Sequence, residues 1–417
     1  MTNTLALMRH IGRWLPLAGL VGVLSGAASA VFLALLDWAT QARLANDGLL
    51  FLLPIGGFAV GLIYWKYGGL AVDGTGHVID QAHTLQSRIP ARMAPLVLLG
   101  TLVTHLFGGS AGREGTAVQM GASLADSIRR LLNITDSQDR RWLIQAGISA
   151  GFSAVFGTPV AGVVFGLEVL NVGRVRYDAL VPCLISAVVG DLTARGLGAH
   201  HTIYPQTPLT ALDAGLVLKV ALAGAVFGLC AWAFVGLMHA IKHAAAKFIR
   251  WSPLRPFVGG LIVIALALLF NTSDYLGLSL PLIQQSVGGQ GVPSYTFAFK
   301  LIFTAVTLGT GFMGGEVTPL FVMGSTLGYT LGAALGVDPA WLASIGFVAV
   351  FAGASNTPLA CALMGIELFG GGAALYLVIG CALAYLFSGH RGIYMTQRLD
   401  TPKFPSDVPS GTALREL

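Results

Sequence analysis

Four glutamates lie within apolar or glycine-rich stretches and are the residues best able to do chemistry here: Glu114, Glu168, Glu316 and Glu367. A carboxylate near the centre of a bilayer costs about 2.5 to 3.5 kcal/mol even on lenient insertion scales, so each one needs a physical explanation. Glu114 and Glu316 both lie among glycines at predicted helix starts. A carboxylate in such a place can hold and release a proton, and it resembles a small anion. We therefore predict that Glu114 is a gate on an anion path and carries the proton.

Each of these acids also has a structural interpretation. Glu114 alone is compatible with an acid that stabilises a helix dipole at the N-terminus. Glu316 occupies an equivalent position, and two acids at paired helix starts favour a functional site. Glu168 and Glu367 lie about three turns into their helices, where a buried carboxylate satisfied by backbone groups or by arginine is an equally good explanation. The sequence leaves the roles of Glu168 and Glu367 open.

Hydroxyl groups near these acids supply the donors that an anion needs when it sheds water. The candidates are Thr75, Thr116, Thr318 and Tyr394, although a single such residue is more often a helix cap or a core residue. The histidines and the four isolated cysteines show no spacing typical of metal ligands, so we expect no metal and no cofactor.

The elements that hold these residues must be transmembrane helices. The sequence is 55% hydrophobic and 10% charged, and its mean hydropathy is +0.75. Apolar stretches long enough to span a bilayer recur, for example 15–36 and 220–238, and no alternating ten-residue pattern of a barrel is present. We predict an all-α, multi-pass membrane protein in a bacterial cytoplasmic (inner) membrane, with many tilted and broken helices packed through the 55 glycines.

The formal charge of +5 comes largely from clusters: Arg129–Arg130, Arg140–Arg141 and the stretch from Lys242 to Arg255. Because positive charges accumulate in cytoplasmic loops, these loops are predicted to face the cytoplasm. We expect no nucleic-acid partner.

An internal repeat relates the two halves of the chain. Residues 157–161 and Glu168 match residues 356–360 and Glu367 at a constant offset of 199, and 112–116 match 314–318 at an offset of 202. Such symmetry is typical of transporters built from inverted repeats. We predict one membrane domain, 1–397, with repeats of about 14–200 and 212–397, and a short cytoplasmic tail, 398–417, without a regulatory domain. The basic stretch Lys242–Arg255 is the best candidate for a join between halves.

Each matched segment opens with Gly, Thr or Pro and then becomes apolar, as a helix does when it begins inside the membrane. Helix N-termini present unpaired N–H groups and a partial positive charge. Several such ends converging would form an anion site.

These motifs resemble the CLC family of anion channels and transporters over essentially the whole chain. Gly74-Thr75-Gly76-His77-Val78 stands where that family has GSGIP, and Gly112-Arg113-Glu114-Gly115-Thr116 where it has G(K/R)EGP. Gly315-Glu316-Val317-Thr318-Pro319 stands where it has GxFxP, and Tyr394 where a late helix contributes the inner tyrosine.

The departures point to the fluoride-transporting branch of that family, whose members carry GREGT and GEVTP. Val169 stands where chloride/proton exchangers have a second proton-carrying acid. The resemblance implies that Glu114 is the gating and proton-carrying glutamate and that Glu316 couples proton and fluoride at a central site. It implies an anion path formed by Thr75, Gly112, Arg113, Gly115, Thr116, Val317, Thr318 and Tyr394. It also implies a homodimer in membrane lipid, with one pore per subunit.

The expected function is a fluoride/proton antiporter that exports cytoplasmic fluoride in exchange for inward protons, with chloride at most a weak substrate. Fluoride is compact and strongly hydrated, and the substitutions add hydroxyl and carboxyl groups along the path. The alternatives are a chloride-selective transporter or a passive anion channel. An enzyme is not expected: Gly147-Ile148-Ser149-Ala150-Gly151 satisfies GxSxG but lacks the strand and turn that this motif needs.

Overall fold

The computed structural model describes residues 2–405 and 407–417, and those residues contain sixteen α-helices. The first eight are α1 (Thr2–Ala45), α2 (Leu53–Tyr67), α3 (Gly74–Thr84), α4 (Met93–Leu106), α5 (Glu114–Leu131), α6 (Ser137–Phe156), α7 (Pro159–Glu168) and α8 (Leu180–Gly196). The next eight are α9 (Ala214–Phe248), α10 (Leu254–Leu269), α11 (Leu280–Val287), α12 (Thr296–Gly309), α13 (Val317–Leu335), α14 (Pro339–Ser355), α15 (Pro358–Phe369) and α16 (Ala374–Phe387). Short 3-10 helices cover Asp47–Leu52, Gly69–Asp73, Tyr177–Ala179, Gly371–Ala373 and Leu414–Glu416.

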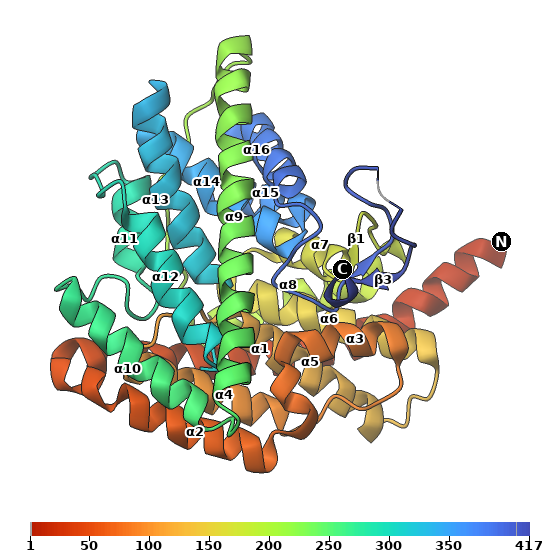
Figure 1. The fold of residues 1–417 in the computed structure, drawn as a ribbon. Coiled ribbons are helices and arrows are strands. Elements are labelled where there is room, and N and C mark those ends of the chain that lie inside the picture. Colours follow the sequence, from red (N-terminus) through yellow and green to blue (C-terminus); the bar gives the residue numbers. More distant parts are fainter. Residues whose placement is uncertain (1, 406) are drawn as a thin grey trace.

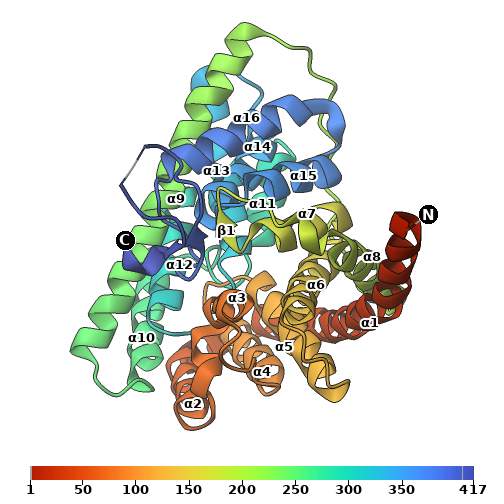
Figure 2. The ribbon, with the colours of Figure 1, turned by 90° about the vertical axis from the view of Figure 1, so that its right-hand side faces the viewer.

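The second eight helices repeat the packing of the first eight. In the first half α1 packs on α6 and α8, and α5 packs on α6; in the second half α9 packs on α14 and α16, and α13 packs on α14. The two halves lie side by side, the first in red to yellow and the second in green to blue (Figures 1 and 2). The prediction of an all-helical bundle with an internal repeat is confirmed.

Glycines allow the closest helix pairs to form. A Cβ on Gly147 of α6 would lie 2.7 Å from the carbonyl carbon of Gly121 in α5, and one on Gly346 of α14 would lie 3.0 Å from that of Gly324 in α13. Small residues at such contacts let backbones approach closely, which is how helices in a bilayer gain packing energy. The GxSxG run therefore has a packing explanation: it lies within α6, against α5.

In the described part of the chain, four helical segments are long and apolar enough to cross a membrane: 8–45, 47–67, 177–196 and 214–248. Most of the others have only 10–17 residues, so they end within the thickness of a bilayer. α9 continues without a break to Phe248, so the expected join between halves at Lys242–Arg255 is wrong. Those basic residues lie at the last turns of α9 and the start of α10, and the halves are instead connected by residues 197–213, which we call the linker.

The basic loop between α5 and α6 is organised around one buried acid. Asp126 is fully buried and accepts from Arg129 Nε at 2.8 Å and Arg130 Nη1 at 3.1 Å, with Arg140 Nε at 3.4 Å. Three guanidinium groups compensate for removing this carboxylate from water. This network of ion pairs holds the loop in place. The loop lies at the end of the molecule that is predicted, from its positive charges, to face the cytoplasm.

The last residues of the chain fold back onto the first half. β1 (Asn171–Val172) pairs in parallel with β2 (Arg398–Leu399), which pairs antiparallel with β3 (Thr412–Ala413). The C-terminal strand β3 is therefore part of this small sheet, with β2 between it and β1. The division into a membrane domain of 1–397 and a separate tail stays a prediction.

Candidate functional site

The two glycine-rich motifs of the repeats meet at the centre of the molecule. Gly112 N donates to Gly315 O at 2.6 Å, and Gly315 N donates to Gly112 O at 2.8 Å. A Cβ on Gly112 would lie 2.9 Å from Gly315 O, and one on Gly315 would lie 2.8 Å from Gly115 N, so no side chain fits at either place. The bridge brings together the N-termini of α5 and α13, each of which presents unpaired N–H groups.

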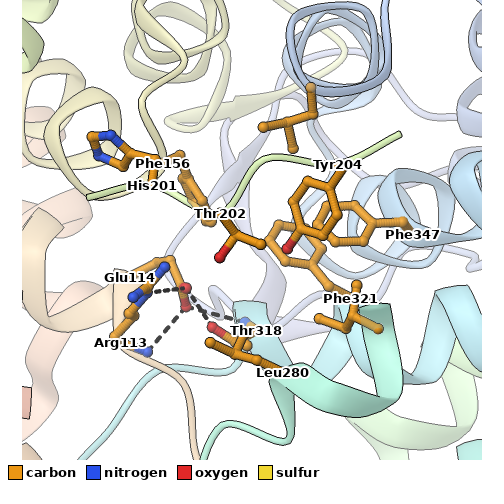
Figure 3. Close-up of a pocket in the computed structure, with 12 residues that line it drawn as sticks. Arg113, Glu114, Phe156, His201, Thr202, Tyr204, Leu280, Thr318, Phe321 and Phe347 are labelled. Carbon is orange, nitrogen blue, oxygen red and sulfur yellow. Dashed lines mark hydrogen bonds and ion pairs between the residues drawn. The ribbon is translucent and has the colours of Figure 1, made fainter. Parts of the chain in front are cut away.

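The Glu114 carboxylate lies on the N-terminus of α13 and also contacts the backbone at the start of its own helix. Its Oε2 accepts from Thr318 N at 3.0 Å and from Arg113 N at 3.0 Å, and the Thr318 hydroxyl donates to Oε1. Arg113 Nε lies 3.6 Å from Oε1. Figure 3 shows these contacts converging on the carboxylate of Glu114, a residue that is 1% exposed. A carboxylate bound by backbone N–H groups, a hydroxyl and a helix N-terminus occupies a site suited to an anion.

The side chains of Glu316 and Thr75 both lie close to Gly115, the residue that follows Glu114 in α5. A Cβ on Gly115 would lie 3.8 Å from Glu316 Oε2 and 3.9 Å from Thr75 Oγ1, so both polar groups face this glycine. Thr75, in the first turn of α3, accepts from Gln119 Nε2 at 3.2 Å. Sequence reasoning missed Gln119, although its position one helical turn after Gly115 places it on the same face of α5.

The other predicted residues divide between the site and its surroundings. Tyr394 is 3% exposed, and its ring packs edge-on against Phe165 of α7, with centroids 6.5 Å apart. Val317 is buried in the first turn of α13. The Thr116 hydroxyl pairs with the Thr101 hydroxyl of α4 at 2.7 Å, so the structure does not bring it to Glu114.

Glu168 and Glu367 form a reciprocal pair of helix caps. Glu168, the last residue of α7, accepts from Leu359 N at 3.2 Å and Ala360 N at 2.9 Å, at the start of α15. Glu367 of α15 accepts from Val160 N at 3.0 Å and Ala161 N at 2.7 Å, at the start of α7. Each carboxylate therefore satisfies donors that the partner helix leaves unpaired. The structure gives both acids a structural role, which the sequence left open.

A cavity of about 20 Å³ lies next to Glu114 and is lined in part by the linker. The linker contributes His201, Thr202 and Tyr204, while Arg113 and Thr318 contribute the opposite polar wall. Sequence reasoning assigned no role to His201 and found no reason to select Thr202 or Tyr204. These linker residues reach the site by folding over the start of a helix that is distant in sequence, and no local sequence pattern predicts such a contact. Among the described residues, no three His, Cys, Asp or Glu side chains are grouped as metal ligands.

Comparisons with known proteins identify the family of this chain. The sequence pattern of the family described as "Voltage gated chloride channel" matches residues 56–389. A "Chloride/fluoride channel protein" of Pseudomonas syringae pv. tomato is 46% identical over 419 residues, which cover 99% of this chain and 92% of that protein. An uncharacterised protein of Methanocaldococcus jannaschii is 24% identical over 380 residues, covering 89% of this chain and 92% of that one.

Solved structures give the same result. The crystal structure of a CLC-type fluoride/proton antiporter, 34% identical, superimposes with a TM-score of 0.90 over 93% of this chain and 98% of that one. A slow cyanobacterial Cl⁻/H⁺ antiporter at 20% identity, with a TM-score of 0.77 over 90% and 94% of the two chains, shares the fold. The resemblance seen in the motifs is thus confirmed, and so is the prediction of an integral membrane protein that crosses the membrane several times. The chain belongs to the voltage-gated chloride channel, or CLC, family.

Proposed function

We propose that this protein is a fluoride/proton antiporter that exports cytoplasmic fluoride in exchange for inward protons, and that it is a transporter rather than an enzyme. The observation that carries the proposal is the Glu114 carboxylate, which fills an anion site built from Thr318 and Arg113. Of the two relatives above that exceed 30% identity, one is named for chloride and fluoride and the other is a fluoride/proton antiporter, so fluoride is the ion common to both names and the choice of fluoride has their support.

Exchange follows from competition for one set of donors. While Glu114 is ionised, it occupies the Thr318 N–H and hydroxyl groups and the Arg113 N–H. A proton taken up by Glu114 removes the charge that these donors hold, so the side chain is released and an anion takes its place. When Glu114 returns to the site and loses its proton on the other side, one anion has moved one way and one proton the other.

Glu316 continues the path beyond Glu114. Its side chain is partly exposed and faces Gly115 together with the Thr75 hydroxyl. Protonated, Glu316 donates a hydrogen bond to an anion at this place; ionised, it repels one. Position 169, which is valine, offers no inner acid. We therefore assign the proton path to Glu114 and Glu316. We place the anion path along Thr75, Gly112, Arg113, Gly115, Val317 and Thr318, with Tyr394 at its inner end. Thr116 lies beside this path, since its hydroxyl pairs with that of Thr101.

The choice of fluoride rests on the donors. A strongly hydrated ion loses much free energy when it leaves water, so its path must supply short, charge-assisted hydrogen bonds. Here an anion meets N–H and O–H groups of Thr318 and then Thr75 and Glu316. A chloride-selective CLC transporter and a passive channel remain the alternatives, and both predict fluxes different from those of the antiporter.

We also propose that the protein works as a homodimer in membrane lipid, with one pore per subunit. α7 and α15 have 10 and 12 residues, too short to cross a bilayer, and the Glu367 carboxylate between them is only partly buried. A carboxylate and two helix ends facing lipid would be unfavourable. A second subunit placed against α7, α8, α15 and α16 would cover them.

The test is ion flux from liposomes that contain the purified protein. An outward fluoride gradient should drive fluoride out and protons in, with chloride moving much more slowly. Chloride flux equal to fluoride flux would refute the proposal. So would a fluoride flux that a pH gradient does not change and that moves no protons.

The Glu114→Gln variant tests the gate in the same assay. Glutamine cannot carry the proton, and its amide group cannot replace a carboxylate that accepts at both oxygens. We expect the variant to lose proton movement coupled to fluoride. A neutral control is Glu416→Gln, at an exposed position near the C-terminus, which should keep the wild-type coupling.

A further inference from the structure

The linker is fastened across the outer end of the proposed path. His201 Nε2 lies 3.0 Å from Ala154 O at the end of α6, and Thr207 N donates to Phe369 O at 2.7 Å at the end of α15. α6 rises about 30 Å away from the basic loop where it begins, so this anchor lies on the side opposite the predicted cytoplasmic face. Thr202 and Tyr204 are held between the two anchors, over Glu114.

The space beneath these residues is the cavity described above, which we call the outer chamber. Its volume of about 20 Å³ is enough for one particle of the size of a water molecule. Phe156, Phe321 and Phe347 give it apolar walls. Figure 3 shows the hydroxyls of Thr202 and Tyr204 pointing into the space above Glu114 and Thr318.

Three groups around the outer chamber can donate to an anion. The Arg113 Nε atom is buried and has no hydrogen-bond partner among the described residues, since Glu114 lies at ion-pair distance only. The Tyr204 ring packs edge-on against Phe347, with centroids 5.5 Å apart, and Tyr204 lines the same cavity as Arg113. The Thr202 hydroxyl lies beside it.

His201 does not add a second cation. Burial lowers the pKa of His201, and the neighbouring charge of Arg195 lowers it further. Because Nε2 faces the carbonyl of Ala154, this nitrogen carries the hydrogen and Nδ1 is an acceptor in the neutral ring. Among the residues that line the outer chamber, Arg113 therefore supplies the positive charge.

Resting on the fluoride transport proposed above, we propose that the outer chamber is a fluoride subsite and that Thr202 and Tyr204 determine its specificity. An anion that leaves the donors of Thr318, when Glu114 returns to them, needs new donors at once. Arg113 and the two linker hydroxyls supply them. Chloride is larger than a water molecule and accepts weaker hydrogen bonds, so a small chamber with hydroxyl donors favours fluoride.

The subsite also links the anion to the proton. A fluoride ion in the outer chamber and an ionised Glu114 repel each other, and Arg113 can balance only one of the two charges. The occupied chamber thus favours neutral Glu114, and the anion departs as Glu114 becomes ionised. Loss of the linker hydroxyls weakens fluoride binding but leaves the proton carrier in place.

The experiment measures fluoride and chloride flux from liposomes for wild type and for the double variant Thr202→Val, Tyr204→Phe. Losing hydrogen bonds to an ion should lower the fluoride rate at subsaturating concentration about tenfold or more. Chloride flux should not fall, and protons moved per fluoride should stay at the wild-type ratio. Tyr295→Phe, which removes a hydroxyl from a 55% exposed tyrosine, is the matched control.

A double variant with wild-type selectivity, or with fluoride and chloride reduced in equal measure, would overturn the proposal. Wild-type protein without proton-coupled fluoride flux would instead refute the proposed function, so the two failures are distinguishable. Tyr204→Phe keeps the ring contacts; should the double variant misfold, Thr202→Val alone carries the same prediction with a smaller effect. Leu368→Ala, which enlarges the chamber, should raise chloride flux relative to fluoride, and an unchanged ratio would refute the size argument.

Discussion

At the scale of single residues, Thr318 has the central role because gate and anion use the same donors. Its N–H and hydroxyl both point to Glu114, and both become free when that side chain leaves. The N–H group is part of the helix start and survives any substitution other than proline. The hydroxyl alone can be removed, so it is the donor whose contribution can be measured.

Thr318→Val should weaken fluoride binding, whereas Thr318→Ser should retain it. A hydrogen bond to a charged group contributes about 1.5–3 kcal/mol, so the dissociation constant should rise about tenfold or more in the valine variant. The measurement is calorimetric titration of fluoride into detergent-solubilised protein in a Glu114→Gln background, where no carboxylate competes. Equal affinities for the valine and serine variants would show that the hydroxyl does not bind the ion.

At the scale of elements, α7 and α15 depend on each other. Each helix is short and begins with a proline, at a position where a backbone N–H would have no partner. The next two N–H groups of each helix donate to the glutamate of the other helix. Neither half of the repeat can satisfy its own helix start. The pair therefore joins the two halves, and the symmetric offset of 199 residues between Glu168 and Glu367 reflects that exchange.

Replacing Glu168 with glutamine should destabilise the protein by about 1–3 kcal/mol, because the amide group turns a donor toward backbone N–H groups. Glu367→Gln should act in the same direction. The check is the thermal unfolding midpoint in detergent, with exposed Glu416→Gln as a control that should change little. Midpoints for Glu168→Gln and Glu416→Gln that coincide would contradict the capping role.

Helix starts were predictable from sequence, and side-chain directions were not. Glycine and proline mark the beginnings of α5, α7, α13 and α15 because their effects on the backbone are local. The direction of the Thr116 hydroxyl depends on Thr101 of α4, and the place of Thr202 and Tyr204 depends on where the linker is anchored. Those contacts join residues distant in sequence, so no local pattern records them.

At the scale of the whole molecule, one surface combines short helices with a regular apolar stripe. On α8 the exposed apolar residues are Leu180, Leu184, Val188 and Leu192, spaced four apart so that they share one helix face. Lipid would also cover such a stripe. The partly buried Glu367 next to it, on α15, is what favours protein over lipid as the covering surface.

Val188→Trp with Leu192→Trp should convert the proposed dimer into a monomer, because two large side chains would prevent close packing of this face. Leu222→Trp with Leu229→Trp is the matched control, since both leucines are about half exposed, at 53% and 52%, on α9, which is not one of the helices proposed at the interface. Light scattering in detergent gives the mass of each variant. The monomer should still exchange fluoride for protons, because every residue of the proposed path comes from one chain. A dimer that survives the α8 substitutions, or that the α9 substitutions break equally well, would place the subunit contact elsewhere.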